Sequence, residues 1–458
     1  MLAAIDRLAI GIPTRNRAEL AAYALRSVLR SAGDRVTVVV SDNSSEDYDR
    51  RPLEALCAAQ PAGTVEYVRP PEPLAMAAHW EWLWRTIDET IAPSHVAYLT
   101  DRLVFAAGAL PQLVEVASAR PGHVISYPWD SVRDDRDPVE LVQRPWTGRL
   151  LELDSARLAA LESRGEHGVW LPRLMDCVAP VAVVKAIERR FGDVFGDVAP
   201  DYRFAYRCLA VCDTLLYLDR SCVVEHGMRR SAGIGYLRGR MNADAADFAG
   251  RVTSDRFGAT PEPAFETGAN AIFQEYCAVR AELGGGRLPP VDRRAYLAAN
   301  AVSVDRIADP DWRGRMRALL ESHGFGRLAG ARRVARLALE MAGYFARHPG
   351  ALAASARRQL VDRPPGSALA NVLPRLGLDP RVREGLTFGS SAEALAHADA
   401  HPRSRSPHAW HVHRLERAGA VLRTTLPPSP DGAHRRHPHP QPAGDRVRDA
   451  GSAGAPAR

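Results

Sequence analysis

Three apolar segments of this chain each end in polar side chains that could bind a ligand. The segments and their polar ends are Leu8–Ile12 before Pro13-Thr14-Arg15-Asn16, Val36–Val40 before Ser41-Asp42-Asn43-Ser44, and Val96–Thr100 before Asp101-Arg102. A buried strand needs the apolar part and excludes the charges, so each polar group should lie at the carboxyl end of a strand. In open parallel sheets that edge is where ligands bind.

The residues alone leave two interpretations of the first two polar groups. In Pro13-Thr14-Arg15-Asn16-Arg17, Thr14 or Asn16 could simply cap the helix that follows. The same loop could instead form a notch for a nucleotide base, with Arg15 or Arg17 near a phosphate. Asp42 could likewise close an Asx turn, or accept a hydrogen bond from a base imide or a ribose hydroxyl.

Short β-rich segments alternate with helical ones from residue 8 onward, which is typical of an α/β sheet with helices on both faces. The expected strands are Leu8–Thr14, Val36–Asp42, Val65–Arg69, Val96–Thr100, His123–Tyr127, Leu150–Leu153, Leu215–Leu218 and Cys222–Glu225. The expected helices are Ala18–Arg30, Arg51–Gln60, Leu74–Ile87, Ala107–Ala119, Ser155–Ser163, Val181–Arg190 and Tyr202–Val211. Residues 129–147 are charged and contain prolines, so we expect a loop there.

The second half of the chain has helical patterns without convincing strands. The candidate helices are Ala269–Leu283, Arg293–Ile307, Trp312–Ser322, Arg332–Arg347, Ala351–Gln359 and Ala392–Ala398. We therefore divide the chain into an α/β domain at 1–240, a helical domain at 241–424 and a tail at 425–458. The tail is rich in Pro, His and Arg and has few large apolar residues, which predicts disorder.

Composition excludes several classes of protein. The chain has 458 residues and a formal net charge of +6, a mild excess that would suit phosphates or anionic lipid alike. No nucleic-acid-binding module or aromatic interleaving is recognisable, so we expect no nucleic acid partner.

Six cysteines in this length do not form a disulfide framework. Residues 1–7 do not resemble a signal peptide, and no segment approaches the roughly 18 apolar residues of a membrane span. We expect a soluble, cytoplasmic protein.

Arginines alternate with apolar residues between Arg327 and Arg358. A basic amphipathic surface of this kind could rest on anionic lipid at the inner face of the membrane. The plainer interpretation is a helical domain that packs on the sheet domain, or forms a homo-oligomer, with its arginines in water.

The order and spacing of four motifs resemble family 2 glycosyltransferases of the GT-A fold. The motifs are Ile-Pro-Thr-Arg-Asn-Arg at 12–17, Val-Ser-Asp-Asn-Ser-Ser-Glu-Asp at 40–47, Tyr-Leu-Thr-Asp-Arg at 98–102, and Pro-Asp-Tyr-Arg-Phe-Ala-Tyr-Arg at 200–207. The resemblance covers residues 8 to about 235. It implies a Rossmann-like αβα sandwich with a mostly parallel sheet, followed here by the helical domain and the tail.

The resemblance also implies an activity, namely inverting transfer of a sugar from a UDP-, GDP- or dTDP-sugar to an acceptor hydroxyl. The acceptor would be a glycan, a lipid-linked molecule or a secondary metabolite. Carried over by position, Thr14 and Asp42 would contact the base and ribose, and Asp101 would sit at the diphosphate. Pro13, Arg15 and Arg102 would also belong to the donor site. Asp201 would be the general base that takes the acceptor proton. No Gln-x-x-Arg-Trp follows Asp201, which favours a non-processive, hexosyltransferase-like enzyme.

Arg102 departs from the family pattern, which usually has a second acidic residue there. A single carboxylate is a poor site for the Mg²⁺ or Mn²⁺ that the resemblance implies. Either His226 joins Asp101 as a metal ligand, or Arg102 itself neutralises the diphosphate and the enzyme depends less on metal. The same departure leaves open a second function, a catalytically weak nucleotide-sugar-binding protein on this fold.

Two further groups have competing interpretations. The spacing of Cys208, Cys212, Cys222 and His226 could hold zinc, although the cysteines could equally be small buried side chains. His79 stands where the resembling family often has asparagine, so it either lines the donor pocket or is a buried helix residue.

Overall fold

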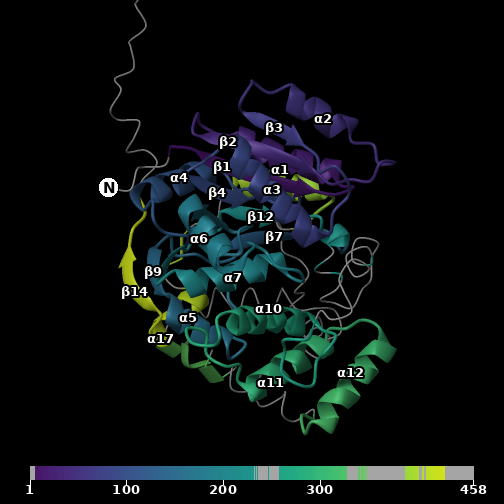
Figure 1. The fold of residues 1–458 in the computed structure, drawn as a ribbon, viewed down its shortest axis with the longest axis vertical. Helices are drawn as coiled ribbons and strands as arrows, with labels where there is room; N and C mark the ends of the chain where they lie inside the picture. The colour runs from purple at the N-terminus through teal and green to yellow at the C-terminus, as the bar shows by residue number, and fades with distance from the viewer. Residues whose placement is uncertain are drawn as a thin grey trace, which may run out of the picture.

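The computed structural model describes residues 6–231, 257–326, 387–401 and 409–428, with positions 233, 235, 246, 339, 340, 342–344, 346, 347, 405 and 406. The described chain is built around a nine-stranded sheet (Figure 1). In spatial order its strands are β14 (Val421–Thr425), β9 (Leu150–Asp154), β11 (Thr214–Leu218), β6 (Ile125–Ser126), β10 (Cys177–Pro180), β4 (His95–Tyr98), β1 (Leu8–Thr14), β2 (Val36–Asp42) and β3 (Val65–Val68).

The sheet is mixed, with a parallel half that contains the three predicted strand ends. Strand β1 pairs in parallel with β2 and β4, and β2 pairs in parallel with β3. Strand β10 separates β4 from β6 and runs antiparallel to both. In the parallel half Thr14 is in register with Asp42, so the carboxyl ends of β1 and β2 lie side by side.

Helices cover both faces of this sheet, because its strands are buried on both sides and alternate residues need partners on each. One face packs on α1 (Ala18–Leu29), α2 (Arg51–Ala58) and α4 (Ala109–Ala119). The opposite face packs on α3 (Met76–Thr90), α5 (Ser155–Glu162), α6 (Val181–Phe191) and α7 (Pro200–Val211). A Cβ at Gly11 would lie 3.0 Å from Leu83 of α3, so glycine lets this helix approach β1. The predicted αβα sandwich is confirmed.

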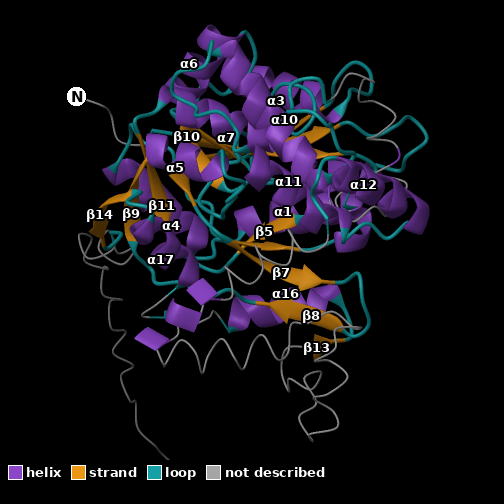
Figure 2. Cartoon of the chain, turned by 90° about the horizontal axis from the view of Figure 1, so that it is seen from below, coloured by secondary structure: helices purple, strands orange, loops and turns teal. Residues whose placement is uncertain are grey.

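A smaller sheet lies beside the first and contains the segment that we expected to be a loop. Its strands, in order, are β13 (Thr387–Phe388), β8 (Val139–Val142), β7 (Trp129–Arg133), β12 (Val223–Glu225) and β5 (Leu103–Phe105). The loop prediction for 129–147 is therefore wrong. Val132 and Leu141 of this hairpin are buried beneath α16 (Ser391–Ala400), which lies over β7 and β8 in Figure 2. The covering helix comes from the far end of the chain, so the segment looks too polar for strands when it is considered alone.

Three helices form a unit with a core of its own at the far end of the molecule from β1–β3 (Figure 1). They are α10 (Gly268–Glu282), α11 (Arg293–Val304) and α12 (Pro310–Ser322). Each begins at a side chain that accepts a hydrogen bond from its first turn, namely Thr267, Asp292 and Asp309, as N-caps do. Tyr276 and Val279 of α10 also belong to the core around α7, so this unit is joined to the helix that carries Asp201.

The C-terminal described segment returns to the α/β part. Helix α17 (Trp410–Arg417) contributes Val412 and Leu415 to the main core, and β14 pairs with β9. The expectation that strands are missing after residue 240 is therefore wrong for β13 and β14, which are edge strands completed by partners more than 200 residues earlier. The domain boundaries otherwise stay predictions.

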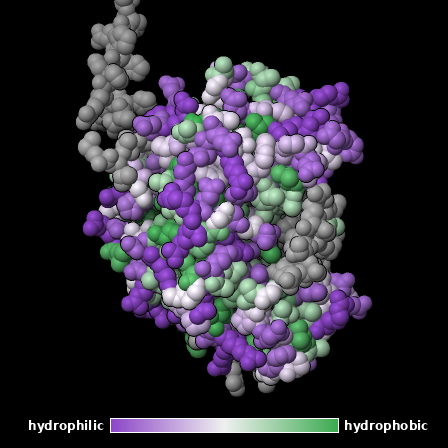
Figure 3. Space-filling model, in the orientation of Figure 1, coloured by the Kyte–Doolittle hydropathy of each residue, from purple (hydrophilic) through white to green (hydrophobic). Residues whose placement is uncertain are grey.

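Several predictions fall on residues outside the described ranges. These are the tail beyond residue 428, the helix Ala351–Gln359, most of Arg332–Arg347, and nearly all of the basic surface from Arg327 to Arg358. Among the described helices, none is long and apolar enough to cross a bilayer. The face shown in Figure 3 is mostly hydrophilic, with hydrophobic residues in small separate groups. Peripheral membrane contact and homo-oligomerisation stay predictions.

Candidate active site

The ends of β1 and β4 are in direct contact. The hydroxyl of Thr14 donates to Oδ2 of Asp101 at 2.9 Å, and Nε of Arg17 lies 3.0 Å from the same oxygen. Thr14 and Asp101 are almost completely buried. Arg17 stands immediately before α1, so the start of this helix delivers a guanidinium to the carboxylate that ends β4.

Asp42 ends β2 with both carboxylate oxygens engaged. Oδ1 accepts from the backbone N–H of Ser44 at 2.9 Å, which is the Asx turn considered above, and Oδ2 accepts from the hydroxyl of Tyr67 at 2.8 Å. Burial, together with the bond to Asp42, raises the pKa of Tyr67. The sequence did not single out Tyr67, although it lies on the neighbouring strand β3. A carboxylate has about four acceptor positions, so Asp42 keeps acceptor capacity for a hydroxyl or an imide.

Side-chain contacts tie the loops beside these strand ends together. Asn43 both donates to and accepts from the backbone of Leu74, at 2.9 and 2.8 Å, and Arg15 donates to the carbonyl of Leu74 at 3.2 Å. Asn16 adopts a left-handed conformation, with φ of 52°, and its backbone N–H donates to the hydroxyl of Ser44 at 2.8 Å. The walls of the predicted base notch are therefore held in place by the protein itself.

His79 supports the end of β2 from the core. Its Nε2 lies 2.7 Å from the hydroxyl of Ser41, and burial lowers its pKa to about 3. The imidazole is therefore neutral. His79 is a buried residue of α3, which agrees with the interpretation of a buried helix residue.

Arg102 turns away from Asp101 and pairs with Glu225. Their side chains approach to 3.1 Å, and both are mostly buried. This ion pair joins the chain after β4 to the end of β12. Arg17, and not Arg102, is therefore the guanidinium beside Asp101.

His226 follows Glu225 and is deeply buried. Its backbone N–H donates to the carbonyl of Arg102 at 2.9 Å, and the ring lies edge-on to Tyr23 of α1 with centroids 5.7 Å apart. Burial lowers its pKa to about 4, so the imidazole is neutral. Its Nε2 has no hydrogen-bond partner among the described residues.

These residues fit a metal ion poorly. Asp101 is held by Arg17, so a cation at this carboxylate would have to displace a guanidinium or share an oxygen with it. His226 has a free neutral nitrogen, but no cluster of three or more His, Cys, Asp or Glu side chains suited to a metal occurs within the described residues. Mg²⁺ or Mn²⁺ at Asp101 and His226 stays a prediction.

The cysteines near His226 are unsuited to zinc. Cys208 and Cys222 are completely buried, and burial raises the pKa of Cys222 to about 12 and that of Cys208 well above its ordinary value. Cys208 packs in the core on one face of the sheet and Cys222 in the core on the other, so they do not share a metal and behave as small apolar side chains.

Asp201 lies in the first turn of α7 and is partly exposed, with 21% of its side chain accessible. Burial raises its pKa, and the neighbouring charge of Arg173 opposes that rise. Nη1 of Arg173 lies 3.9 Å from Oδ2 of Asp201, while its Nε and Nη2 bind the buried carboxylate of Asp176 at 2.9 and 2.5 Å. The guanidinium also lies against the rings of Trp129 and Tyr202, 4.5 and 5.4 Å from their centroids.

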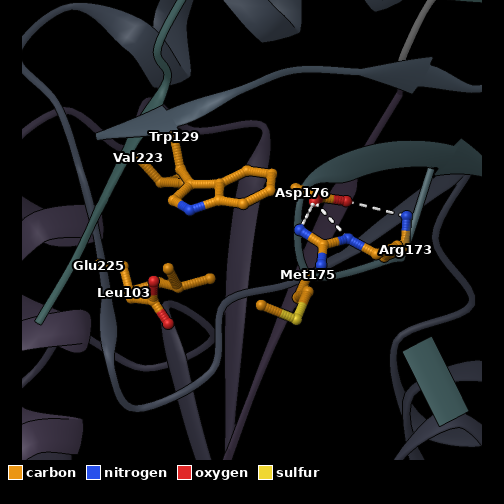
Figure 4. A pocket seen from close by; sticks show the side chains of 7 residues that line it. All are labelled: Leu103, Trp129, Arg173, Met175, Asp176, Val223 and Glu225. Carbon is orange, nitrogen blue, oxygen red and sulfur yellow. Dashed lines mark hydrogen bonds and ion pairs between the residues drawn. The ribbon is translucent and has the colours of Figure 1, made fainter. Parts of the chain in front are cut away.

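A pocket of about 50 Å³ lies between this group and the end of β4. Figure 4 shows the indole of Trp129 along one side, the paired Arg173 and Asp176 on another, and Glu225 facing them. The remaining lining residues are Leu103, Met175 and Val223. Glu225 is the partner of Arg102, and Arg173 is the neighbour of Asp201. Two residues that line the pocket are therefore ion-pair partners of Arg102 and of Asp201.

The parallel half of the sheet and its strand-end residues match a known family. Residues 9–177 match the family model described as "Glycosyl transferase family 2". These residues belong to glycosyl transferase family 2. The matched range contains Thr14, Asp42, Asp101 and Arg173, and it ends before Asp201.

The chain is also similar to solved glycosyltransferase structures, at low identity. Crystal structures of S. aureus TarS 1-349, without and with UDP-GlcNAc, share 11% and 12% identity, each covering 68% of this chain and 83% of TarS 1-349 at a TM-score of 0.38. GalNAc-T7 with UDP, GalNAc and Mn²⁺ shares 11% identity over 53% of this chain and 50% of its own, at a TM-score of 0.35. No curated protein matches the chain at a significant level.

Proposed function

We propose that this protein transfers a sugar from a nucleotide-diphosphate-sugar to an acceptor hydroxyl with inversion. The observation that carries the proposal is the contact of Thr14 with Asp101 beside Asp42, within a family 2 domain. Pro13, Thr14, Arg15 and Asp42 form the wall for the base and ribose. Asp101 and the arginines around it would face the diphosphate. Arg173, which lines the pocket at Trp129, is the neighbour of the proposed base Asp201.

In the proposed reaction, the acceptor oxygen forms a bond to the anomeric carbon as the carbon–oxygen bond to the diphosphate breaks. The electron pair of the broken bond leaves on the phosphate oxygen, where cationic groups stabilise the developing charge. The proton of the acceptor hydroxyl passes to the carboxylate of Asp201. Attack from the side opposite the leaving group inverts the anomeric configuration, with hexose transfer in single, non-processive steps.

A thermal-shift screen tests donor recognition. The protein is mixed separately with UDP-, GDP- and dTDP-sugars, and one base is expected to raise the melting temperature. ATP is the control, because a nucleotide that lacks the matching base and the sugar diphosphate should give a smaller shift. If none of the donors has an effect, the proposal fails at its first step.

The charge of Arg173 is expected to set the acidic limb of the pH profile. Asp201 acts as a base only when it is ionised, and its pKa lies above the ordinary 3.8, so kcat/KM falls as the pH drops through that raised value. Arg173→Gln removes a positive charge that lowers the pKa of Asp201, so the fall of kcat/KM at low pH should begin at a higher pH. The measurement is the pH dependence of donor hydrolysis in both proteins. Arg189→Gln, on the exposed face of α6, is the matched control, and an unchanged limb in Arg173→Gln would contradict this role.

A second candidate function is a nucleotide-sugar-binding protein with little catalysis, and the pairing of Asp101 with Arg17 favours it over a metal-dependent enzyme. The two candidates differ in turnover. A binding protein would show the thermal shift without consuming donor, whether or not Asp201 is intact.

A further inference from the structure

Arg17 occupies the position at Asp101 where a divalent cation would bind. Its Nε is 3.0 Å from Oδ2 of Asp101, and that carboxylate is 1% exposed. The Thr14 hydroxyl donates to the same oxygen. Thr14 thus contacts this oxygen through a hydrogen bond and Arg17 through an ion pair, which suits a carboxylate that orients a guanidinium.

The rest of the guanidinium is directed to other partners. Nη1 of Arg17 donates to the carbonyl of Arg230 at 3.1 Å, which lies at the end of the 3₁₀ turn η1 (Met228–Arg230). Its Nη2 makes no hydrogen bond with any described residue, although 17% of the side chain is accessible. Arginine presents a planar fork of donors that matches phosphate oxygens. Arg17 is therefore held at two nitrogens and has one donor left for a ligand.

The neighbouring groups leave little for a metal to bind. Arg102 replaces a second carboxylate and is itself held by Glu225. His226 offers one nitrogen, and a metal would still require Asp101 to give up its guanidinium partner. Mg²⁺ sites on diphosphates usually keep one or two protein carboxylates, and Asp101 is already paired with Arg17.

We propose that Arg17 takes the place of a divalent metal, so that the protein binds the donor diphosphate without one. The inference rests on the proposed nucleotide-sugar donor. Asp101 then acts as a positioning residue that holds the guanidinium, and Nη2 of Arg17 donates to a diphosphate oxygen. The negative charge of the leaving diphosphate is balanced by a fixed side chain.

The test is the affinity for nucleoside diphosphates, measured by titration calorimetry with UDP, GDP and dTDP in EDTA and again in Mn²⁺. The wild type is expected to bind one of them in EDTA with a Kd within about threefold of the Mn²⁺ value. Arg17→Gln should bind at least tenfold more weakly in EDTA, since a hydrogen bond to a charged group is lost. In Mn²⁺ this variant should recover, because Asp101 has become available to the metal.

Two further variants keep the result interpretable. Asp101→Asn removes the charge that positions Arg17, so it should bind more weakly than the wild type in EDTA. Mn²⁺ should not restore its affinity, in contrast to Arg17→Gln, because the carboxylate for the metal is gone. Arg26→Gln, on the exposed side of the same helix, should behave as the wild type. If the wild type binds at least tenfold more tightly in Mn²⁺ than in EDTA, the inference is overturned and the proposed function stays intact. If no nucleoside diphosphate binds under either condition, the proposed function fails and the inference fails with it.

Discussion

Replacement of Asp201 by asparagine is expected to lower kcat for donor consumption by about 10²- to 10⁴-fold, the usual contribution of a positioned general base. The amide preserves the shape of the side chain but cannot accept the acceptor proton. Binding of the nucleoside diphosphate should stay unchanged, because the proposed role of Asp201 is to take the acceptor proton and not to contact the nucleotide. The rate is measured as nucleoside diphosphate released from the donor that the thermal-shift screen identifies.

Asp197→Asn is the matched control for that experiment. Asp197 lies in the exposed loop four positions before Asp201, so the same chemical change there should leave kcat within about twofold. If Asp201→Asn and the wild type turn over donor equally, the base is another residue. If both are inert while the donor still binds, the protein is the binding protein of the second candidate function.

Replacement of Glu275 by alanine is expected to give the largest loss of stability. Glu275 in α10 is completely buried, pairs with Arg203 of α7, and accepts hydrogen bonds from the backbone N–H groups of Val198 and Ala199 at 3.1 and 2.8 Å. Removing one partner of a buried ion pair costs about 3–5 kcal/mol. The free energy of unfolding, from denaturant titration, should fall by that amount.

The same change should also lower catalysis, because Val198 and Ala199 lead directly into the turn that carries Asp201. A displacement of about 1 Å can cost a factor of about 100 in rate, so kcat measured well below the unfolding temperature should fall by roughly 10- to 100-fold. Glu275→Gln keeps an oxygen for the two backbone N–H groups and should retain more activity than Glu275→Ala. Glu266→Ala, an exposed glutamate just before α10, should change neither property. Equal kcat in Glu275→Ala and the wild type would show that the helical unit does not position the base.

The strand-end residues could be predicted because buried parallel strands have a simple sequence pattern. An apolar run that stops at a charge locates the edge of the sheet, and Thr14, Asp42 and Asp101 all lie at that edge. The pattern indicates only which end of the strand a side chain occupies. It left open whether Arg15, Arg17 or Arg102 faces the phosphate; in the structure Arg102 pairs with Glu225, and Arg17 reaches Asp101 from the start of α1.

The acceptor side could not be predicted in the same way. Trp129 lies on a strand of the small sheet, which the sequence presented as a charged loop, and Arg173 lies in a segment without regular structure. Their proximity depends on the pairing of β7 with β12 and on the buried carboxylate of Asp176. Glu275 is 74 residues beyond Asp201, and no local pattern connects a glutamate in one helix with the backbone before another. Such residues are found only when the packing of distant segments is known.

The most direct test of the whole account is proton NMR of the sugar that the protein first releases from its donor, with water or the natural acceptor as the nucleophile. The proposed mechanism, in which Asp201 acts as the base on the side opposite the leaving diphosphate, predicts that the first-formed anomer has the configuration inverted from the donor. It also predicts that Asp201→Asn forms almost none of it. A product that retains the donor's configuration, or consumption of donor that is unaffected by the loss of Asp201, would contradict it.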